Sequence, residues 1–176
     1  MSKNFNYNFI TSTDVSAIKY KLPEVENDWD EFDWRQKRFE VHKETKTIPL
    51  IFDKDFRLDN PTYHISYTIF NSQMETLKKI YKKYVGPGYI IRALLVMLPA
   101  KSKIPKHIDS GTSLELCTRT HIPIITHKDV VFDIDGEQKH LKEGEIWEIN
   151  NANKRHAVTN GSEKDRVHLI IDWMTQ

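Results

Sequence analysis

Hydrophobic positions divide the chain into two unlike halves. After residue 88, apolar residues recur in short runs separated by turn-forming residues, at positions 89–98, 114–126, 130–134, 146–149 and 166–173. Asp135-Gly136 is a dipeptide that favours a tight β-hairpin. Short strands with turns between them, and without helices alternating with them, are typical of an all-β sandwich or barrel. We therefore predict a mainly β fold of the jelly-roll kind.

The pattern before residue 87 differs and predicts helices and irregular segments. Ser72 and Glu75 have the spacing of a capping box that would open a helix, whose apolar face would consist of Met74, Leu77, Ile80, Tyr81 and Tyr84. Gly86-Pro87-Gly88 would end that helix and mark the boundary between the halves. Residues 48–52 suggest a short edge strand, because proline is poorly tolerated in a central one.

These patterns together predict one domain, residues 1–176. In this interpretation residues 1–86 form a helical or irregular flank that packs on one sheet. Residues 87–176 form the β core, which carries the candidate chemistry described below.

Composition and charge narrow the partners and the compartment. The 176 residues carry 26 basic and 25 acidic side chains, and this net charge of +1 favours neither nucleic acid nor an anionic membrane surface. The longest apolar stretch, 89–100, is too short to span a bilayer and contains Arg92. A single cysteine, Cys117, excludes an internal disulfide and suits a reducing compartment. We expect a cytoplasmic protein without a membrane segment.

One strongly acidic segment interrupts this balanced charge. Residues 24–33 hold six acidic side chains, with Trp29 and Phe32 between them. The main interpretation is a partly solvated loop or short helix held in place by its aromatic residues. The alternative is a rim that receives a basic substrate.

Candidate metal ligands begin at His107-Ile108-Asp109 and continue with His156 far downstream. On a strand, His107 and Asp109 would point to the same face, because residues two apart do so. Two histidines and one carboxylate are the ligands of a facial triad, which holds Fe(II) and leaves three coordination positions open for a co-substrate and O2. The combination predicts an iron-dependent oxygenase.

Arg166 lies ten residues beyond His156, with a turn-like stretch, 159–162, between them. In a hairpin centred on Gly161 the two residues would be cross-strand partners, with β-carbons roughly 5 Å apart. The guanidinium of Arg166 could then reach an acidic co-substrate bound to the iron. A slip of one residue in this register would turn one of the two side chains away.

Beyond these residues, the C-terminal half resembles the aspartyl/asparaginyl β-hydroxylase family. The resemblance covers roughly residues 90–174, through the ordered motifs at 107–111, 119–124, 141–147, 156–160 and 166–173. The family consists of 2-oxoglutarate- and Fe(II)-dependent oxygenases built on a double-stranded β-helix, a cupin-like relative of the jelly roll. They couple decarboxylation of 2-oxoglutarate to succinate and CO2 with hydroxylation of a C–H bond.

The resemblance also implies roles for individual residues. His107 and His156 would be iron ligands, and Arg166 would pair with the distal carboxylate of 2-oxoglutarate through a two-pronged bond. Arg119 and His121 share a strand face and would lie beside the iron-bound end of the co-substrate. Hydrogen bonding of Arg119 and His121 across the sheet, without contact to a ligand, is the alternative.

Two positions depart from the animal members of the family. Those proteins have glycine in place of Asp109, and a basic residue for their acidic substrate in place of Cys117. The sequence therefore leaves the substrate open among a free amino acid, a small metabolite and a protein residue. A non-catalytic cupin-like module that binds a metal or a small acid is the alternative function.

The remaining polar residues carry weaker expectations. His168 shares a face with Arg166 and would either line the pocket or be a neutral, hydrogen-bonded core residue. We expect turn-forming roles for Asn151, Asn153 and Asn160, and surface positions for His42, His64, His127 and His140.

Overall fold

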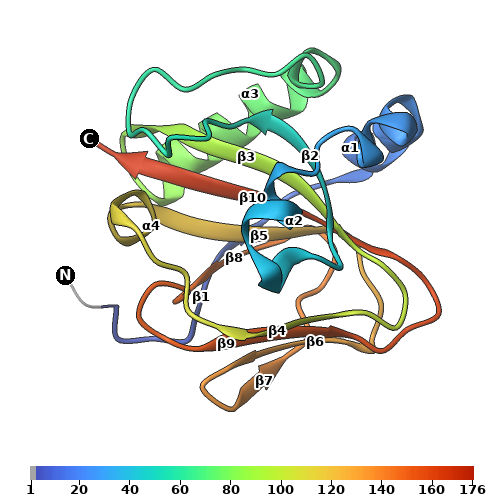
Figure 1. Cartoon of the computed structure of the whole chain (residues 1–176). Coiled ribbons are helices and arrows are strands. Elements are labelled where there is room, and N and C mark those ends of the chain that lie inside the picture. Colours follow the sequence, from blue (N-terminus) through green and yellow to red (C-terminus); the bar gives the residue numbers. More distant parts are fainter. Residues whose placement is uncertain (1–2) are drawn as a thin grey trace.

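Two antiparallel β-sheets face each other in the computed structural model, which describes residues 3–176 (Figure 1). The large sheet has six strands in the order β1 (Tyr7–Ser12), β8 (Glu145–Ile149), β5 (Thr118–Ile125), β10 (Arg166–Thr175), β3 (Gly88–Leu98) and β2 (Lys46–Ile51). The small sheet has four strands in the order β4 (Lys103–His107), β9 (His156–Asn160), β6 (Val130–Ile134) and β7 (Glu137–Lys139).

From β3 onward the chain crosses repeatedly between the two sheets, and only β6 and β7 are consecutive strands of the same sheet. Strands β3, β5, β8 and β10 belong to the large sheet, whereas β4, β6, β7 and β9 belong to the small one. Eight strands shared in this way between two sheets form a jelly roll. The mainly β fold predicted from the sequence is therefore confirmed.

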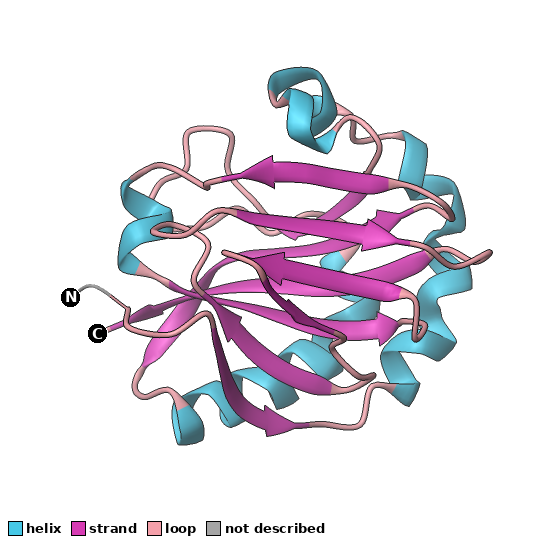
Figure 2. Ribbon diagram, turned by 90° about the horizontal axis from the view of Figure 1, so that it is seen from below, coloured by secondary structure: helices cyan, strands magenta, loops and turns pink. Residues whose placement is uncertain are grey.

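Helices from the first half of the chain cover the outer face of the large sheet. They are α1 (Ser16–Lys21), the 3₁₀ segment η1 (Leu22–Asp30) and α3 (Tyr67–Tyr84). Their apolar side chains, such as Trp29, Met74 and Tyr81, form the largest buried cluster together with outward-facing residues of β3, β5 and β10. Figure 2 shows strands at the centre of the molecule and helices around them. The predicted packing of helices on one sheet is thus confirmed.

Two short helical segments do not cover the large sheet but contribute side chains to the candidate site described below. These are α2 (Trp34–Arg38) and the 3₁₀ turn η2 (Glu40–His42), and η2 contacts β4 of the small sheet. Figure 1 shows α2 at a level between the two sheets, rather than on the outer face of the large one.

The alternation of side chains along β10 separates the core from the site. Val167, Leu169 and Ile171 belong to the cluster beneath the helices. Arg166, His168 and Asp172 alternate with them and are also buried, on the face that side-chain alternation in a strand turns inward. The interior of the jelly roll beside this strand is therefore polar as well as apolar.

Three local predictions need correction. The long helix begins at Tyr67, so Ser72 is an exposed position inside the helix and not its N-cap. The buried apolar face of the helix therefore also includes Tyr67 and Phe70. Residues 112–116 form a short helix, α4 (Thr112–Leu116), and β5 begins only at Thr118. Strand β1 was not predicted, although Tyr7 and Phe9 alternate with asparagines at the spacing of a strand.

Other predictions from the first half of the chain agree with the structure. Residues 48–52 largely coincide with β2, which is an edge strand and contains Pro49. Residues 24–30 of the acidic segment lie in the 3₁₀ helix η1, residues 31–33 follow it, and Trp29 is buried. In the described part of the chain no helix has the length and apolar character needed to cross a membrane.

Candidate metal and co-substrate site

The predicted metal ligands come together at the edge of the small sheet. His107 ends β4, His156 begins β9, and the two are cross-strand partners whose ring centroids lie 4.2 Å apart. Asp109 follows β4, and its Oδ1 lies 3.4 Å from Nε2 of His107. The backbone N–H of Asp109 donates to the carbonyl oxygen of Asn151, which ties this segment to the turn before β9.

The two carboxylate oxygens of Asp109 have different surroundings. Oδ2 accepts hydrogen bonds from Nη1 of Arg119 at 2.7 Å and from Nδ2 of Asn151 at 2.8 Å. Burial opposes ionisation, but the charge of Arg119 and the hydrogen bond to His107 outweigh it and hold the pKa of Asp109 well below its ordinary value. Asp109 is therefore an ionised carboxylate with Oδ1 turned toward the imidazole of His107.

Arg119 is held in turn by a buried row of charged side chains on three neighbouring strands, Arg92, Asp172 and Arg119 itself, which we call the charge ladder. Asp172 of β10 lies opposite both Arg119 on β5 and Arg92 on β3. It accepts hydrogen bonds from Nε of Arg119 at 2.7 Å and from Nη2 at 2.8 Å, and it forms an ion pair with Arg92. Arg119 is thus fixed between two carboxylates. Arg119 therefore orients Asp109, and its bonds to Asp172 are the hydrogen bonding across the sheet given above as the alternative; contact of Arg119 with a co-substrate stays a prediction.

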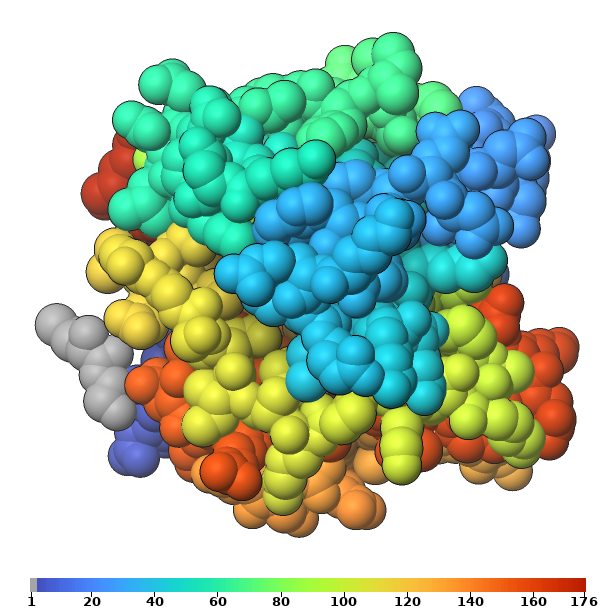
Figure 3. Space-filling view, in the orientation of Figure 1, coloured from blue at the N-terminus to red at the C-terminus, as the bar shows by residue number. Residues whose placement is uncertain are grey.

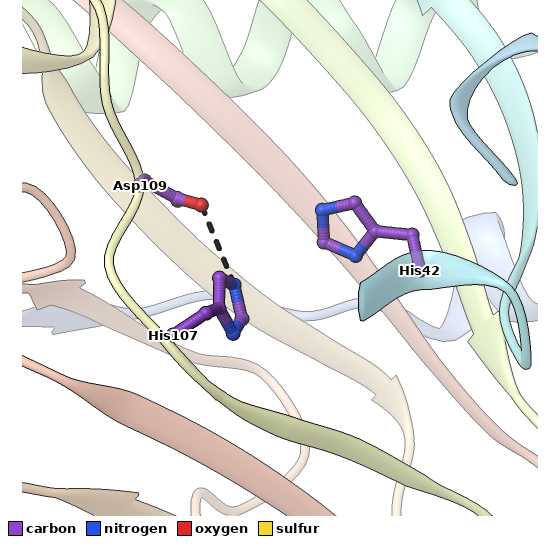
Figure 4. A group of neighbouring side chains, drawn as sticks. All are labelled: His42, His107 and Asp109. Atoms are coloured by element: carbon purple, nitrogen blue, oxygen red, sulfur yellow. Dashed lines mark ion pairs between the residues drawn. The ribbon is translucent and has the colours of Figure 1, made fainter. Parts of the chain in front are cut away.

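His42 also lies beside the site, which the sequence analysis did not predict. Its ring is 5.6 Å from that of His107, and single ligand atoms of His42, His107 and Asp109 lie within 4.8 Å of one another (Figure 4). The expected surface position of His42 is wrong, because η2 turns back against β4 and buries much of the side chain. The apolar neighbours Phe39 and Val41 were the available signal in the sequence.

The site imidazoles other than His107 are neutral. Burial is the main cause; it lowers the pKa of His156 to about 4, and burial together with the charge of Arg35 lowers that of His42 to about 2. Neutral imidazole is the form that binds metal ions. Burial favours the neutral form of His107 as well, but its hydrogen bonds to Asp109 and to the carbonyl oxygen of Pro105 outweigh burial and raise its pKa, so a bound metal ion would displace that proton. The imidazoles of His107 and His156 and the carboxylate of Asp109 form a donor set that suits Fe(II).

Arg166 lies in the same cavity, which we call the inner cavity. The inner cavity is lined by the side chains of His107, Asp109, Arg119, His121, His156 and Arg166, among others. Arg166 is only 1% exposed, and its Nε and Nη2 have no hydrogen-bond partner among the residues that the structure describes. Burial lowers its pKa to about 9, so the guanidinium stays charged at neutral pH. An unpaired buried charge is costly, and a bound carboxylate such as that of 2-oxoglutarate would compensate it.

The hairpin predicted between His156 and Arg166 is wrong. His156 lies on β9 in the small sheet, with His107 and Ile134 as its partners, whereas Arg166 begins β10 in the large sheet. The turn around Gly161 carries the chain from one sheet to the other. The two side chains nevertheless line one cavity, because they approach it from opposite sheets.

Two other inward-facing histidines differ in position. His121 lines the inner cavity, and its Nδ1 has no partner within the described chain. His168 is fully buried behind it, stacked on Phe132 with centroids 5.5 Å apart, and it is absent from the cavity lining. Burial lowers the pKa of His168 well below its ordinary value, so it is a neutral core residue, although neither ring nitrogen has a hydrogen-bond partner in residues 3–176.

Asn151 has a role that the sequence analysis missed. We predicted a turn former, and it does lie in a turn, but it is completely buried and donates to Asp109. Asn160 holds the β9–β10 connection through hydrogen bonds to the carbonyl oxygens of Leu98, Pro99 and Lys164. It therefore fits the predicted structural role.

A larger pocket of about 450 Å³ adjoins the inner cavity. This outer pocket is lined by α2, η2, the segment 107–114 and the aromatic residues Phe39, Phe52 and Phe56. It shares Arg35, His42, His107, Asp109 and Arg119 with the inner cavity. Its volume is in the range of pockets that bind small molecules.

A jelly roll that places a histidine pair, a carboxylate and an unpaired buried arginine around one cavity defines the class of the 2-oxoglutarate- and Fe(II)-dependent oxygenases. The sequence agrees: residues 12–176 match the family model described as Aspartyl/Asparaginyl beta-hydroxylase. The chain belongs to this family, and it is a 2-oxoglutarate- and Fe(II)-dependent hydroxylase, as its motifs predicted. A comparison with curated protein sequences finds no match.

Solved structures with the same fold include several oxygenases. The viral collagen prolyl hydroxylase of Paramecium Bursaria Chlorella virus-1 has a TM-score of 0.59 at 5% identity, covering 100% of this chain and 99% of that chain. A Pseudomonas putida prolyl-4-hydroxylase has a TM-score of 0.56 at 8% identity, covering 98% and 94%. A 2OG-Fe(II) oxygenase family protein from Burkholderia pseudomallei has a TM-score of 0.59 at 13% identity, covering 74% and 66%. Identities this low show a shared fold.

Proposed function

We propose that His107, Asp109 and His156 hold the iron of this hydroxylase and that Arg166 binds the distal carboxylate of 2-oxoglutarate. The observation that carries this assignment is the buried Arg166 without a partner, in the same cavity as the three candidate ligands. His107 and His156 lie on paired strands, which position metal ligands more firmly than a loop does.

The bound iron and 2-oxoglutarate supply the oxidising chemistry, in which decarboxylation to succinate and CO2 accompanies hydroxylation of a C–H bond. The chain supplies position and charge. Arg119 and Asn151 keep Oδ2 of Asp109 occupied and leave Oδ1 for the metal. His121 contributes an unpaired Nδ1 to the cavity wall, where it can donate to or accept from the co-substrate.

The outer pocket is the proposed place for the substrate. It opens beside His107 and Asp109, so a bound substrate would present a C–H bond to the metal. Its volume of about 450 Å³ suits a free amino acid, a small metabolite or one residue of a peptide. A prolyl hydroxylase of the same fold from Trichoplax adhaerens is known in complex with a peptide fragment, at 9% identity and a TM-score of 0.58.

Arg166→Ala tests the role of the arginine. We expect it to raise the 2-oxoglutarate concentration needed for succinate release by about 100-fold, because a charge-assisted pair worth up to about 3 kcal/mol is lost. Iron affinity, measured by competition with a chelator, should stay unchanged. Lys37→Ala, at an exposed position outside the lining of both cavities, is the control. An unchanged requirement for 2-oxoglutarate in Arg166→Ala would remove Arg166 from the proposed role.

A further inference from the structure

Arg35 is a second buried guanidinium that has no carboxylate partner. Its side chain comes from α2, it is 8% exposed, and its Nη1 donates to Oγ1 of Thr47 at 3.2 Å. No ion pair of Arg35 is found within the described chain. It lines both the outer pocket and the inner cavity, so it lies where the two meet.

The charges around Arg35 do not balance. Arg35, Arg92 and Arg119 are buried, and the carboxylates whose charges act on Arg35 are those of Asp172, which is buried, and Asp109, which is partly buried. Both carboxylates already accept from Arg119, and Asp172 also pairs with Arg92. The remaining acid of the pocket lining, Asp55, is exposed and pairs with Arg57 on the surface. One positive charge is therefore left over.

The proposed iron and co-substrate leave this excess unchanged. A divalent cation and the dianion of 2-oxoglutarate add no net charge, and the charge of Arg166 lies deeper in the inner cavity, outside the lining of the outer pocket. Burial and the repulsion of Arg119 lower the pKa of Arg35 to about 10, so it is still charged at neutral pH. Burying such a charge without a partner is costly unless a ligand compensates it.

Part of the outer pocket's wall is aromatic. Phe52 and Phe56 contact each other with centroids 6.0 Å apart, and the guanidinium of Arg92 lies 5.0 Å from the ring centroid of Phe56. Phe39 adds a third ring to the lining. Such a wall favours an apolar, flat or branched group on the ligand.

From this juxtaposition we propose that the outer pocket binds a small substrate that carries a carboxylate and an apolar, preferably aromatic, body. The carboxylate pairs with Arg35, and the body packs on Phe39, Phe52 and Phe56. The proposal rests on the function proposed above and specifies its substrate class. Figure 3 shows the blue residues of α2 and η2 beside the yellow residues of the segment after β4, two of the parts that line this pocket.

The residue that we propose to bind the substrate's carboxylate, Arg35, is not the one that binds the acidic substrate in the family's animal members. The position that is basic in those proteins holds Cys117 here, and Cys117 is buried and does not line the outer pocket. Arg35 comes from the first half of the chain, and in this protein it replaces that basic residue as the group that recognises the anion.

Calorimetric titration of the anaerobic protein, loaded with Fe(II) and 2-oxoglutarate, tests this proposal. The probes are 3-phenylpropionate and its uncharged analogue 3-phenylpropanamide. Loading is verified beforehand by the visible absorption of the iron-bound keto acid. The variants are Arg35→Gln, which keeps a donor for Thr47, and Lys37→Gln, which removes an exposed positive charge from the same helix, outside the lining of both cavities.

We expect the wild-type protein to bind the carboxylate at least about tenfold more tightly than the amide, because a hydrogen bond to a charged group contributes about 1.5–3 kcal/mol. Arg35→Gln should remove this preference and leave amide binding and co-substrate loading unchanged. Its melting temperature should equal or exceed that of the wild type, because an uncompensated buried charge is lost. Lys37→Gln should bind both probes as the wild type does.

Several results would overturn the proposal. Equal binding of acid and amide, no binding of either probe to the loaded protein, or an unchanged preference in Arg35→Gln would each reject it. Loss of 2-oxoglutarate loading in Arg35→Gln would make Arg35 a co-substrate residue instead. Failure of the wild-type protein itself to load 2-oxoglutarate would contradict the proposed function, and this step is measured before any probe is added.

Discussion

The carboxylate of Asp109 is held in one orientation by two residues that are not candidate metal ligands, Asn151 and Arg119. Nδ2 of Asn151 and the guanidinium of Arg119 both donate to Oδ2, and the backbone N–H of Asp109 donates to the carbonyl oxygen of Asn151. Mutation of a group that orients a metal ligand in this way typically lowers metal affinity by about 10- to 100-fold.

Asn151→Ala should therefore weaken Fe(II) binding by about 10- to 100-fold, because Oδ2 loses one donor and the carboxylate gains freedom to rotate. Chelator competition under anaerobic conditions measures the affinity. Asn153→Ala is the matched control, because Asn153 lies in the same turn but donates to Asn150 and not to Asp109. Equal affinities in the two variants would show that Asn151 has only a structural role.

His42 and His156 both lie next to His107, and they differ in how firmly the fold holds them. His156 is on a strand paired with β4, whereas His42 is on the 3₁₀ turn η2. We expect His156→Ala to abolish iron binding at micromolar concentrations and His42→Ala to change the affinity by less than about tenfold, since a triad needs three ligands. The same chelator competition compares them. The reverse order would make His42 the third ligand.

At the scale of single elements, strand β10 carries the buried carboxylate that links its two neighbouring strands. Asp172 lies between Arg119 and Arg92 on its two neighbouring strands and is completely buried. Burial raises its pKa, but the two guanidinium groups more than offset this and lower the pKa below its ordinary value. The stability that Asp172 contributes is thus present at neutral pH and is lost as the pH falls through the lowered pKa.

Asp172→Asn should lower the free energy of unfolding by about 3–5 kcal/mol, because two buried guanidinium groups lose their shared carboxylate. Urea denaturation at neutral pH measures this free energy. Asp59→Asn, at an exposed position, should change it by no more than about 0.5 kcal/mol. If the two variants were equally stable, the ladder would not contribute to folding.

The strands after residue 88 were predictable because their apolar runs and turn residues are local signals. The pairing of β9 was not, because the stretch 159–162 has the composition of a hairpin turn whether it joins two strands of one sheet or crosses between sheets. The start of α3 was missed for a similar reason, since Ser72 and Glu75 satisfy a capping pattern inside the helix. Each error arose where a local pattern is compatible with two tertiary arrangements.

The candidate triad and Arg166 could be named from sequence because a known pattern of residue types and order marks them. Arg35 and His42 could not, because they reach the site only when α2 and η2 fold back between the sheets. The role of Asn151 needed its contact with Asp109, 42 positions away in the chain. Residues that complete a site from a distant segment leave no spacing signal.

At the scale of the whole molecule, the fold separates stability from chemistry. The largest apolar cluster lies between the large sheet and the helices that cover it, on the side away from the small sheet. The space between the two sheets holds a smaller apolar cluster and the inner cavity with its buried charges. Polar groups that are expensive to bury are thus concentrated where a metal, a co-substrate and a substrate can compensate them.

The central claim is that Fe(II) and 2-oxoglutarate bind together where the inner cavity meets the outer pocket, beside His107 and Asp109. Addition of 2-oxoglutarate to the anaerobic Fe(II)-loaded protein tests it most directly, with the visible spectrum as the readout. We predict a weak charge-transfer band of the chelated keto acid in the wild-type protein, and none in His107→Ala. Iron that binds without producing the band would contradict the account and favour a non-catalytic metal- or acid-binding module.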